Sequence, residues 1–152
     1  MFKSLALAIL IVCTAATASA QMGMDLTLNR SMYMQYEPIY ACVTLRNDTG
    51  RPLVFGKNPK LQGFLLFEVT DQRGNVVPKR PGAELSVTGL ILSPGQIKRM
   101  IVPINRYSQL DRIGVYRVHA YVSHSQLPYE YKTKDLKFNV EPGVTVWKRS
   151  VG

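Results

Sequence analysis

The sequence predicts an all-β domain, a sandwich of two packed antiparallel sheets with about seven or eight strands. Two observations carry this prediction. Apolar residues recur at every second position over most of the chain, and turn-forming residues interrupt them about every ten residues. No stretch has a long helical period, and residues 105–111 offer at most one or two helical turns. A closed β-barrel is the alternative that the same pattern allows.

The first 20 residues have the composition of a secretion signal. Lys3 supplies a positive charge, residues 5–12 form an apolar run, and Ala18-Ser19-Ala20 places small residues before Gln21. The run is too short to span a bilayer as a stable helix, and no later segment is longer. We therefore expect a secreted or periplasmic protein with no transmembrane segment after signal removal. An uncleaved anchor is the alternative.

Length and charge fit one exported domain. Of the 152 residues, we assign 1–20 to the signal peptide, 21–142 to the sandwich and 143–152 to a C-terminal tail. Loss of Lys3 with the signal lowers the net charge from +9 to +8. The basic residues occur mainly as isolated pairs, which differs from the clustered pattern of nucleic-acid-binding proteins. We expect no nucleic-acid partner.

The predicted strands are the segments between turns in which apolar and polar residues alternate. Turn chemistry is dense at 47–52, 71–75 and 93–96, where Asn, Asp, Gly and Pro gather. Between these turns we expect strands at 25–30, 39–46, 53–55, 64–70, 76–77, 97–104, 114–123 and 135–140, with short extended pieces in 85–92. Side chains of opposite parity face opposite sides of a sheet. We expect the core to include Ile39, Ala41, Val43, Leu45, Tyr116, Val118, Ala120 and Val122.

Residues 111–118, Asp-Arg-Ile-Gly-Val-Tyr-Arg-Val, resemble the tyrosine corner of immunoglobulin-like domains. The resemblance implies that the Tyr116 hydroxyl bonds to the main chain just upstream. Gly114 supplies the small residue two positions earlier, and we expect Asp111 to cap or hydrogen-bond within the corner. The resemblance makes the predicted sandwich an immunoglobulin-like one.

A wider pattern over residues 36–123 is similar to the intracellular proteinase-inhibitor family, to macroglobulin-type domains and to bacterial immunoglobulin-like domains. It includes Tyr36-Glu37-Pro38-Ile39-Tyr40, the segment 67–77, and Leu92-Ser93-Pro94-Gly95. The inhibitor resemblance implies an exposed loop that mimics a substrate. The segments 57–62 and 78–83 are the candidates for such a loop.

No motif indicates an enzyme. The chain lacks a nucleophile elbow, a zinc-protease helix, a phosphate-binding glycine loop and a paired-cysteine metal motif. His119 and His124 lie close in sequence to Ser123 and Ser125, but an orienting acid and an oxyanion site would also be needed. We expect both histidines at the surface of a strand and its turn, and no catalytic residues.

Four methionines are candidate ligands of a copper site. Met22 with Met24, and Met32 with Met34, are spaced to share one face of a strand, and thioether sulfur is a ligand suited to Cu(I). His119 or His124 would complete the site. The alternative is that the methionines fill gaps in an apolar layer, with no cofactor bound.

Cys42 has no partner in the exported chain, because Cys13 leaves with the signal. Alternation places Cys42 on the outer face of its strand, beside Tyr40 and Thr44. An exported thiol of this kind either forms a disulfide with another molecule or serves as a small, partly buried apolar residue. Both interpretations stay open.

Exposed tyrosines and two loops are the predicted contact surface. Tyrosine presents a large, rigid area with a polar tip, and is common in interfaces. The candidate residues are Tyr40, Tyr121, Tyr129, Tyr131 and Trp147, with the loops 47–52 and 123–128. We predict an exported, non-catalytic binding or assembly module whose partner is another exported protein or an envelope component. A copper carrier and a proteinase inhibitor are the alternatives.

Overall fold

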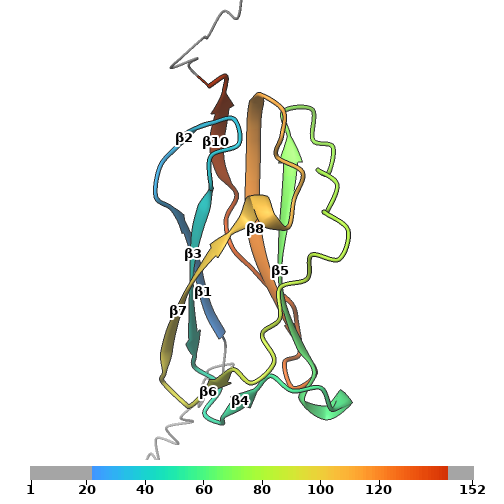
Figure 1. Ribbon diagram of the computed structural model, residues 1–152. Helices are drawn as coiled ribbons and strands as arrows, with labels where there is room; N and C mark the ends of the chain where they lie inside the picture. Colours follow the sequence, from blue (N-terminus) through green and yellow to red (C-terminus); the bar gives the residue numbers. More distant parts are fainter. Residues whose placement is uncertain (1–21, 144–152) are drawn as a thin grey trace, which may run out of the picture.

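The core lies between two β-sheets, whose alternating apolar residues fill the space between them (Figure 1). The computed structural model describes residues 22–143. One sheet has three antiparallel strands in the order β1–β3–β7. These strands are β1 (Met22–Leu28), β3 (Tyr40–Asn47) and β7 (Ile97–Pro103).

The second sheet has five strands, with β2–β10–β8–β5 as its main order and β9 beside β8. Its strands are β2 (Met32–Met34), β5 (Gly63–Asp71), β8 (Gly114–His124), β9 (Tyr131–Lys132) and β10 (Leu136–Glu141). Only β2 runs parallel to its neighbour, β10. A small ladder of β4 (Leu53–Val54) and β6 (Ile91–Leu92) lies at one end of the sandwich (Figure 1).

Two short 3₁₀ helices, η1 (Pro59–Leu61) and η2 (Ile104–Arg106), are the helical elements of the described chain. The second falls at the start of the segment where the sequence predicts one or two helical turns. Among residues 22–143, no helix has the length and apolar character that crossing a bilayer requires.

The predicted fold class is confirmed: the chain forms an immunoglobulin-like β-sandwich, with the long strands split between two sheets. Several boundaries differ from the prediction. β1 begins at Met22 and not at Asp25, and in 85–92 only Ile91–Leu92 forms a strand. The short strands β2 and β9 were not predicted, since two or three residues are too few to show an alternation.

Core positions follow the predicted alternation on both sheets. The inward residues of β3 and the preceding Ile39 are all buried, and so are the inward residues of β8 that face them. This buried set comprises Ile39, Ala41, Val43, Leu45, Tyr116, Val118, Ala120 and Val122. Burial of this apolar surface is the main favourable contribution to folding, because the described chain has no disulfide.

The tyrosine corner stands at the start of β8. The Tyr116 hydroxyl donates a hydrogen bond to the Arg112 carbonyl oxygen over 2.7 Å, which is the bond that the resemblance implies. Gly114 has φ +151°, a conformation that side chains rarely adopt, so glycine is needed at this position. The Tyr116 ring stacks on Phe138, with centroids 5.6 Å apart. The corner therefore joins β8 to β10 by packing as well as by the ladder.

Candidate functional site

Strand β5 is the outermost strand of the five-stranded sheet, and one of its edges has no partner strand over most of its length. The Val69 carbonyl oxygen faces this edge, where it accepts a hydrogen bond from the Val77 N–H over 2.8 Å. In an antiparallel sheet, alternate residues direct both main-chain groups to the same side. Leu65 and Phe67 therefore point their N–H and C=O groups toward the same edge as Val69.

These main-chain groups are withdrawn from bulk water without a protein partner. Leu65 is 0% exposed and Phe67 is 5% exposed. Within residues 22–143, no hydrogen bond reaches the main chain of Leu65 or Phe67 from the open edge. A buried polar group left unpaired costs about 1–3 kcal/mol, and nearly all such groups in folded proteins bind protein or water. A strand that reaches this edge would therefore supply hydrogen bonds that the described chain leaves unmade.

A groove of about 450 Å³ lies beside this edge. Its walls are β5 on one side and the loop after Val77 on the other, which runs out past β5 before it returns to the sheet at Leu90 (Figure 1). The apolar part of the lining comprises Phe64, Leu66, Phe67, Ala83, Leu85 and Tyr107. The groove thus combines apolar side chains with unpaired main-chain groups.

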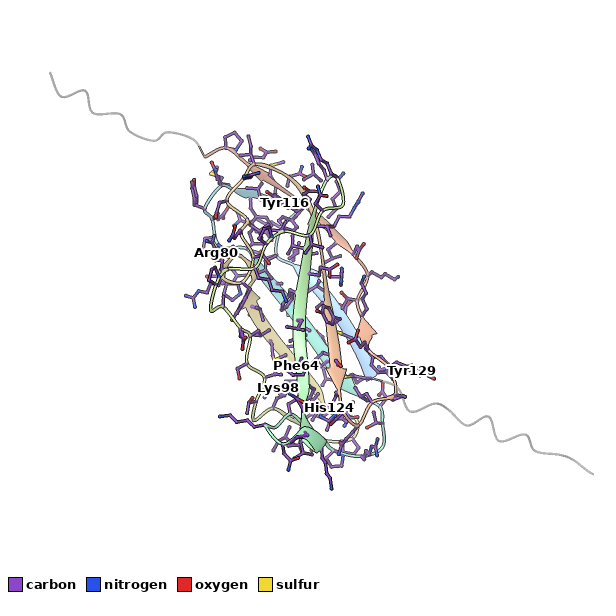
Figure 2. The ribbon with its side chains drawn as sticks, turned by 90° about the vertical axis from the view of Figure 1, so that its right-hand side faces the viewer. Phe64, Arg80, Lys98, Tyr116, His124 and Tyr129 are labelled. Carbon is purple, nitrogen blue, oxygen red and sulfur yellow. The ribbon has the colours of Figure 1, made fainter. Side chains whose placement is uncertain are left out.

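The outer wall of the groove is fixed by hydrogen bonds at Arg80. Its N–H donates to the Tyr107 carbonyl oxygen over 2.8 Å, and its Nε donates to the Asn105 carbonyl oxygen over 2.9 Å. Its terminal nitrogen lies 2.5 Å from the Asp111 carboxylate. Figure 2 views the molecule from this side, with Arg80 beside β5 and Phe64 on it. The groove is therefore largely preformed.

Asp111 connects the tyrosine corner to this groove. The sequence predicts that Asp111 caps or hydrogen-bonds in the corner. In the structure its main-chain oxygen accepts from Gln35 Nε2 over 2.5 Å, while its carboxylate pairs with Arg80 across the loop. The carboxylate thus holds the groove wall and not the corner itself.

The two loops predicted as contact surfaces lie together at the opposite end of the sandwich from Tyr116. Arg51 donates a hydrogen bond to the Gln126 carbonyl oxygen over 2.6 Å, which joins the two loops. Asn47 anchors the first of them from the interior, where it is fully buried. The two loops therefore form one connected surface at this end of the molecule.

His124 holds the second loop. It is 4% exposed, so the expectation of a surface histidine is wrong. Nδ1 accepts a hydrogen bond from the Gln126 N–H over 3.0 Å, and Nε2 therefore carries the hydrogen that binds the Val54 carbonyl oxygen, also over 3.0 Å. Because both nitrogens are engaged, His124 has none free to activate Ser123 or Ser125 (Figure 2 labels His124).

His119 is also buried, at 7% exposure, and again the expectation of a surface position is wrong. It lies on the outer side of β8, where the segment after β9 covers it and places Asp135 Oδ1 3.2 Å from Nδ1. On the neighbouring strand β5, Glu68 Oε1 lies 3.8 Å from Nε2. Burial, assisted by the charge of Lys132, lowers the pKa of His119, although both carboxylates oppose this shift.

The six candidate copper ligands occupy separate parts of the fold. Met22 and Met24 belong to β1 in the three-stranded sheet, and Met22 is buried in the core. Met32 and Met34 are exposed on β2 in the other sheet. His119 and His124 bind the groups described above. Among the described residues, no group of three or more His, Cys, Asp or Glu side chains is placed to hold a metal ion.

The predicted tyrosine surface is divided as well. Tyr40 lies on the outer face of the three-stranded sheet, whereas Tyr121 lies on the outer face of the five-stranded sheet. Tyr131 packs partly against the core, and Tyr129 is exposed on the loop before it. Trp147, like the signal segment and most of the tail, lies outside the described residues.

Sequence reasoning named 78–83 as a candidate exposed loop, and this segment forms part of the groove wall, but the groove beside β5 was not predicted. The available signal was the pair Pro78 and Pro81, which predicts that the chain leaves the sheet there. How far the loop stands from β5 depends on contacts distant in sequence, such as that of Arg80 with Asp111. The groove could therefore not be predicted from local sequence patterns.

Solved domains similar in structure to this chain share little sequence identity with it. It resembles part of a family 123 glycoside hydrolase from Clostridium perfringens, with TM-score 0.48 and 14% identity over 81% of this chain and 27% of that one. It also resembles a CARDB domain from Pyrococcus furiosus, solved with di-metal ions, with TM-score 0.49 and 12% identity over 82% and 90% of the two chains. The solution structure of that CARDB domain matches with TM-score 0.48 and 13% identity, over 78% of this chain and 93% of that one. No family model and no curated protein matches the sequence.

Proposed function

We propose that this protein is an exported, non-catalytic binding module that holds an extended segment of another exported protein or envelope component along β5. The observation that carries the proposal is the pair of residues at the open edge of β5 whose main-chain groups are unpaired: Phe67, which lines the apolar groove, and Leu65, which lies next to it on the same edge. An added strand satisfies such groups, since its own N–H and C=O groups have the matching spacing. The bound segment would extend the five-stranded sheet.

The groove also restricts which segment fits. Side chains of an added strand alternate between two faces, so those on the outer face meet Phe64 and Leu66. We expect apolar residues at every second position of the ligand. The net charge of +8 that remains after signal removal favours a ligand with acidic residues, because opposite charge speeds association, although at the groove itself the charges of Lys79 and Glu84 offset each other.

A matched pair of substitutions tests the groove. Ala83 lines it, whereas Thr88 is exposed on the same loop outside it. Peptides selected from a phage-displayed library by the purified protein should carry alternating apolar residues. Ala83→Trp should weaken their binding at least tenfold, about 1.4 kcal/mol, by filling the groove. Thr88→Trp should leave binding unchanged. Equal binding by both variants, or no selected peptides, would contradict the proposal.

Export is supported by the first 20 residues alone. Expression of the full chain in a bacterial host, followed by fractionation and N-terminal sequencing, tests it. We expect protein outside the cytoplasm that begins at Gln21. Protein that keeps Met1 and stays in the cytoplasm would rule out export without affecting the groove.

A further inference from the structure

The outer face of the three-stranded sheet is uncovered and carries apolar residues around Cys42. Cys42 lies on the central strand β3, between Thr27 of β1 and Ile101 of β7 in the same row. Ile101 is 71% exposed, Ile97 is 56% exposed and Tyr40 is 45% exposed. Exposed apolar side chains gathered on one sheet face are typical of an interaction surface.

A charged row crosses the same face. Asp25 on β1 and Arg99 on β7 lie on either side of Thr44, in register with it. Strands are about 4.8 Å apart, so the main chains of these two residues are roughly 10 Å apart, with Thr44 between them. Both are exposed, and within residues 22–143 neither makes an ion pair. Each is thus available to a charge outside the molecule.

We propose that this face is an interface between two copies of the chain, related by a two-fold axis that runs along β3. Rotation about such an axis exchanges the positions of β1 and β7 while it keeps each row at the same height. Asp25 then meets Arg99 of the second copy, and Arg99 meets Asp25 of the second copy. Two ion pairs form from residues that have no partner within one chain.

The same rotation also brings apolar residues and the Cys42 thiol of the two copies into contact. Cys42 lies near the axis and faces Cys42 of the second copy, whereas Ile101 packs over Thr27 of the second copy. Arg46 also lies near the axis, but its charge is paired with Asp48 over 2.8 Å, which lessens repulsion. A two-fold interface requires such reciprocal contacts, because each residue pair that meets across it must occur twice, once in each direction.

Pairing between strand edges is a less suitable way to join two copies here. Lys98 of β7 is on the side of the strand that faces the core, and a charge so placed on an edge strand opposes edge-to-edge pairing. Face-to-face packing avoids this charge. The inference concerns a surface separate from the β5 groove, so the two proposals can fail independently.

Charge exchange tests the two-fold axis. Protein covering residues 21–152, which includes the whole described fold, should sediment as a dimer under reducing conditions. Asp25→Arg or Arg99→Asp alone should raise the dissociation constant at least tenfold, since each places like charges at both symmetric contacts. The double variant should restore dimers. Arg73→Asp, an equal charge change at an exposed turn, is the control and should have no effect.

Cysteine placement gives a second, geometric test. With oxidised glutathione, Cys42 thiolate displaces one glutathione thiol, and Cys42 of the second copy displaces the other, which leaves a disulfide between the copies. In a Cys42→Ser background, Thr27→Cys with Ile101→Cys should crosslink two chains, while either alone should not. The two positions cannot bridge within one chain, because disulfides need Cα atoms less than about 7 Å apart. Monomers at all concentrations, or no rescue by the double charge exchange, would overturn the proposal.

Discussion

Asn47 is fully buried, and every hydrogen-bonding group of its side chain has a partner. Nδ2 donates to the carbonyl oxygens of Arg51 and Leu92, both over 2.7 Å. Oδ1 accepts from the N–H and the hydroxyl of Thr49, over 3.0 and 2.6 Å. One residue therefore shapes the turn after β3 and attaches it to β6. Only an amide supplies two donors and an acceptor in this arrangement.

Asn47→Ala should lower the free energy of unfolding by about 2–4 kcal/mol, because it leaves buried groups unpaired. Asn47→Asp should cost at least as much, since a carboxylate faces the two carbonyl oxygens that Nδ2 now serves. Urea denaturation measures both. The control is Asn75→Ala at an exposed turn, where the loss should be small. Equal losses at the two positions would show that burial of Asn47 carries no special weight.

His119 couples stability to pH. Its pKa is lowered in the folded protein below the ordinary value of 6.5, chiefly by burial and then by Lys132, against the pull of Glu68 and Asp135. The unfolded chain therefore takes up a proton first as the pH falls. Stability should be complete above pH 6.5, should fall as the pH drops below 6.5, and should level off below the folded pKa.

Denaturation of the wild type and of His119→Gln at pH 8 and pH 5 checks this coupling. Glutamine does not titrate, so the variant should lose less stability between the two pH values than the wild type. The difference between the two proteins removes the contribution of the other titrating groups. An equal loss in both would mean that His119 binds protons alike in the folded and unfolded states.

At the scale of the elements, strand β5 is tightly packed at its first residue, Gly63. A Cβ added at Gly63 would lie 2.5 Å from Phe55 Cδ1 and 2.6 Å from His124 Cδ2. The rings of Phe55 and His124 meet edge to face, with centroids 4.9 Å apart. Glycine is thus required here by space, so that β5 and β8 can close beside the β4–β6 ladder.

Gly63→Ala should destabilise the protein by about 1–3 kcal/mol, because it forces two packed rings apart. Gly143→Ala, where no atom of the described residues lies within 4 Å of the added Cβ, should change stability by less than about 0.5 kcal/mol. Thermal or urea denaturation compares them. If Gly63→Ala were as harmless as Gly143→Ala, the rings could relax, and the packing would be looser than described.

The long strands were predictable because their alternation is local. Tyr116 to Val122 and Ile39 to Leu45 show their buried parity in the sequence itself. The burial of His119 was not predictable in the same way, because outward parity predicts exposure unless another segment covers the face. Asp135, which covers it, is distant in sequence. Likewise the groove depends on Arg80 reaching Asp111, a contact that no local pattern encodes.

At the scale of the whole molecule, the sandwich presents two separate surfaces. One is the groove beside β5, with unpaired main-chain groups; the other is the uncovered face of the three-stranded sheet. They belong to different sheets, so a ligand in the groove and a second copy on the other face do not compete for residues. This arrangement suits a module that binds one partner while it assembles through another surface.

Amide hydrogen exchange along β5, followed by NMR, tests the central claim most directly. Leu66 and Glu68 bond to β8 and should be strongly protected, whereas the N–H groups of Leu65 and Phe67 have no hydrogen-bond partner at the edge and should exchange faster than these in the free protein despite their burial. A peptide that fills the groove should protect Leu65 and Phe67. Strong protection of these two amides in the free protein, or no change when such a peptide binds, would contradict a strand-receiving edge on β5.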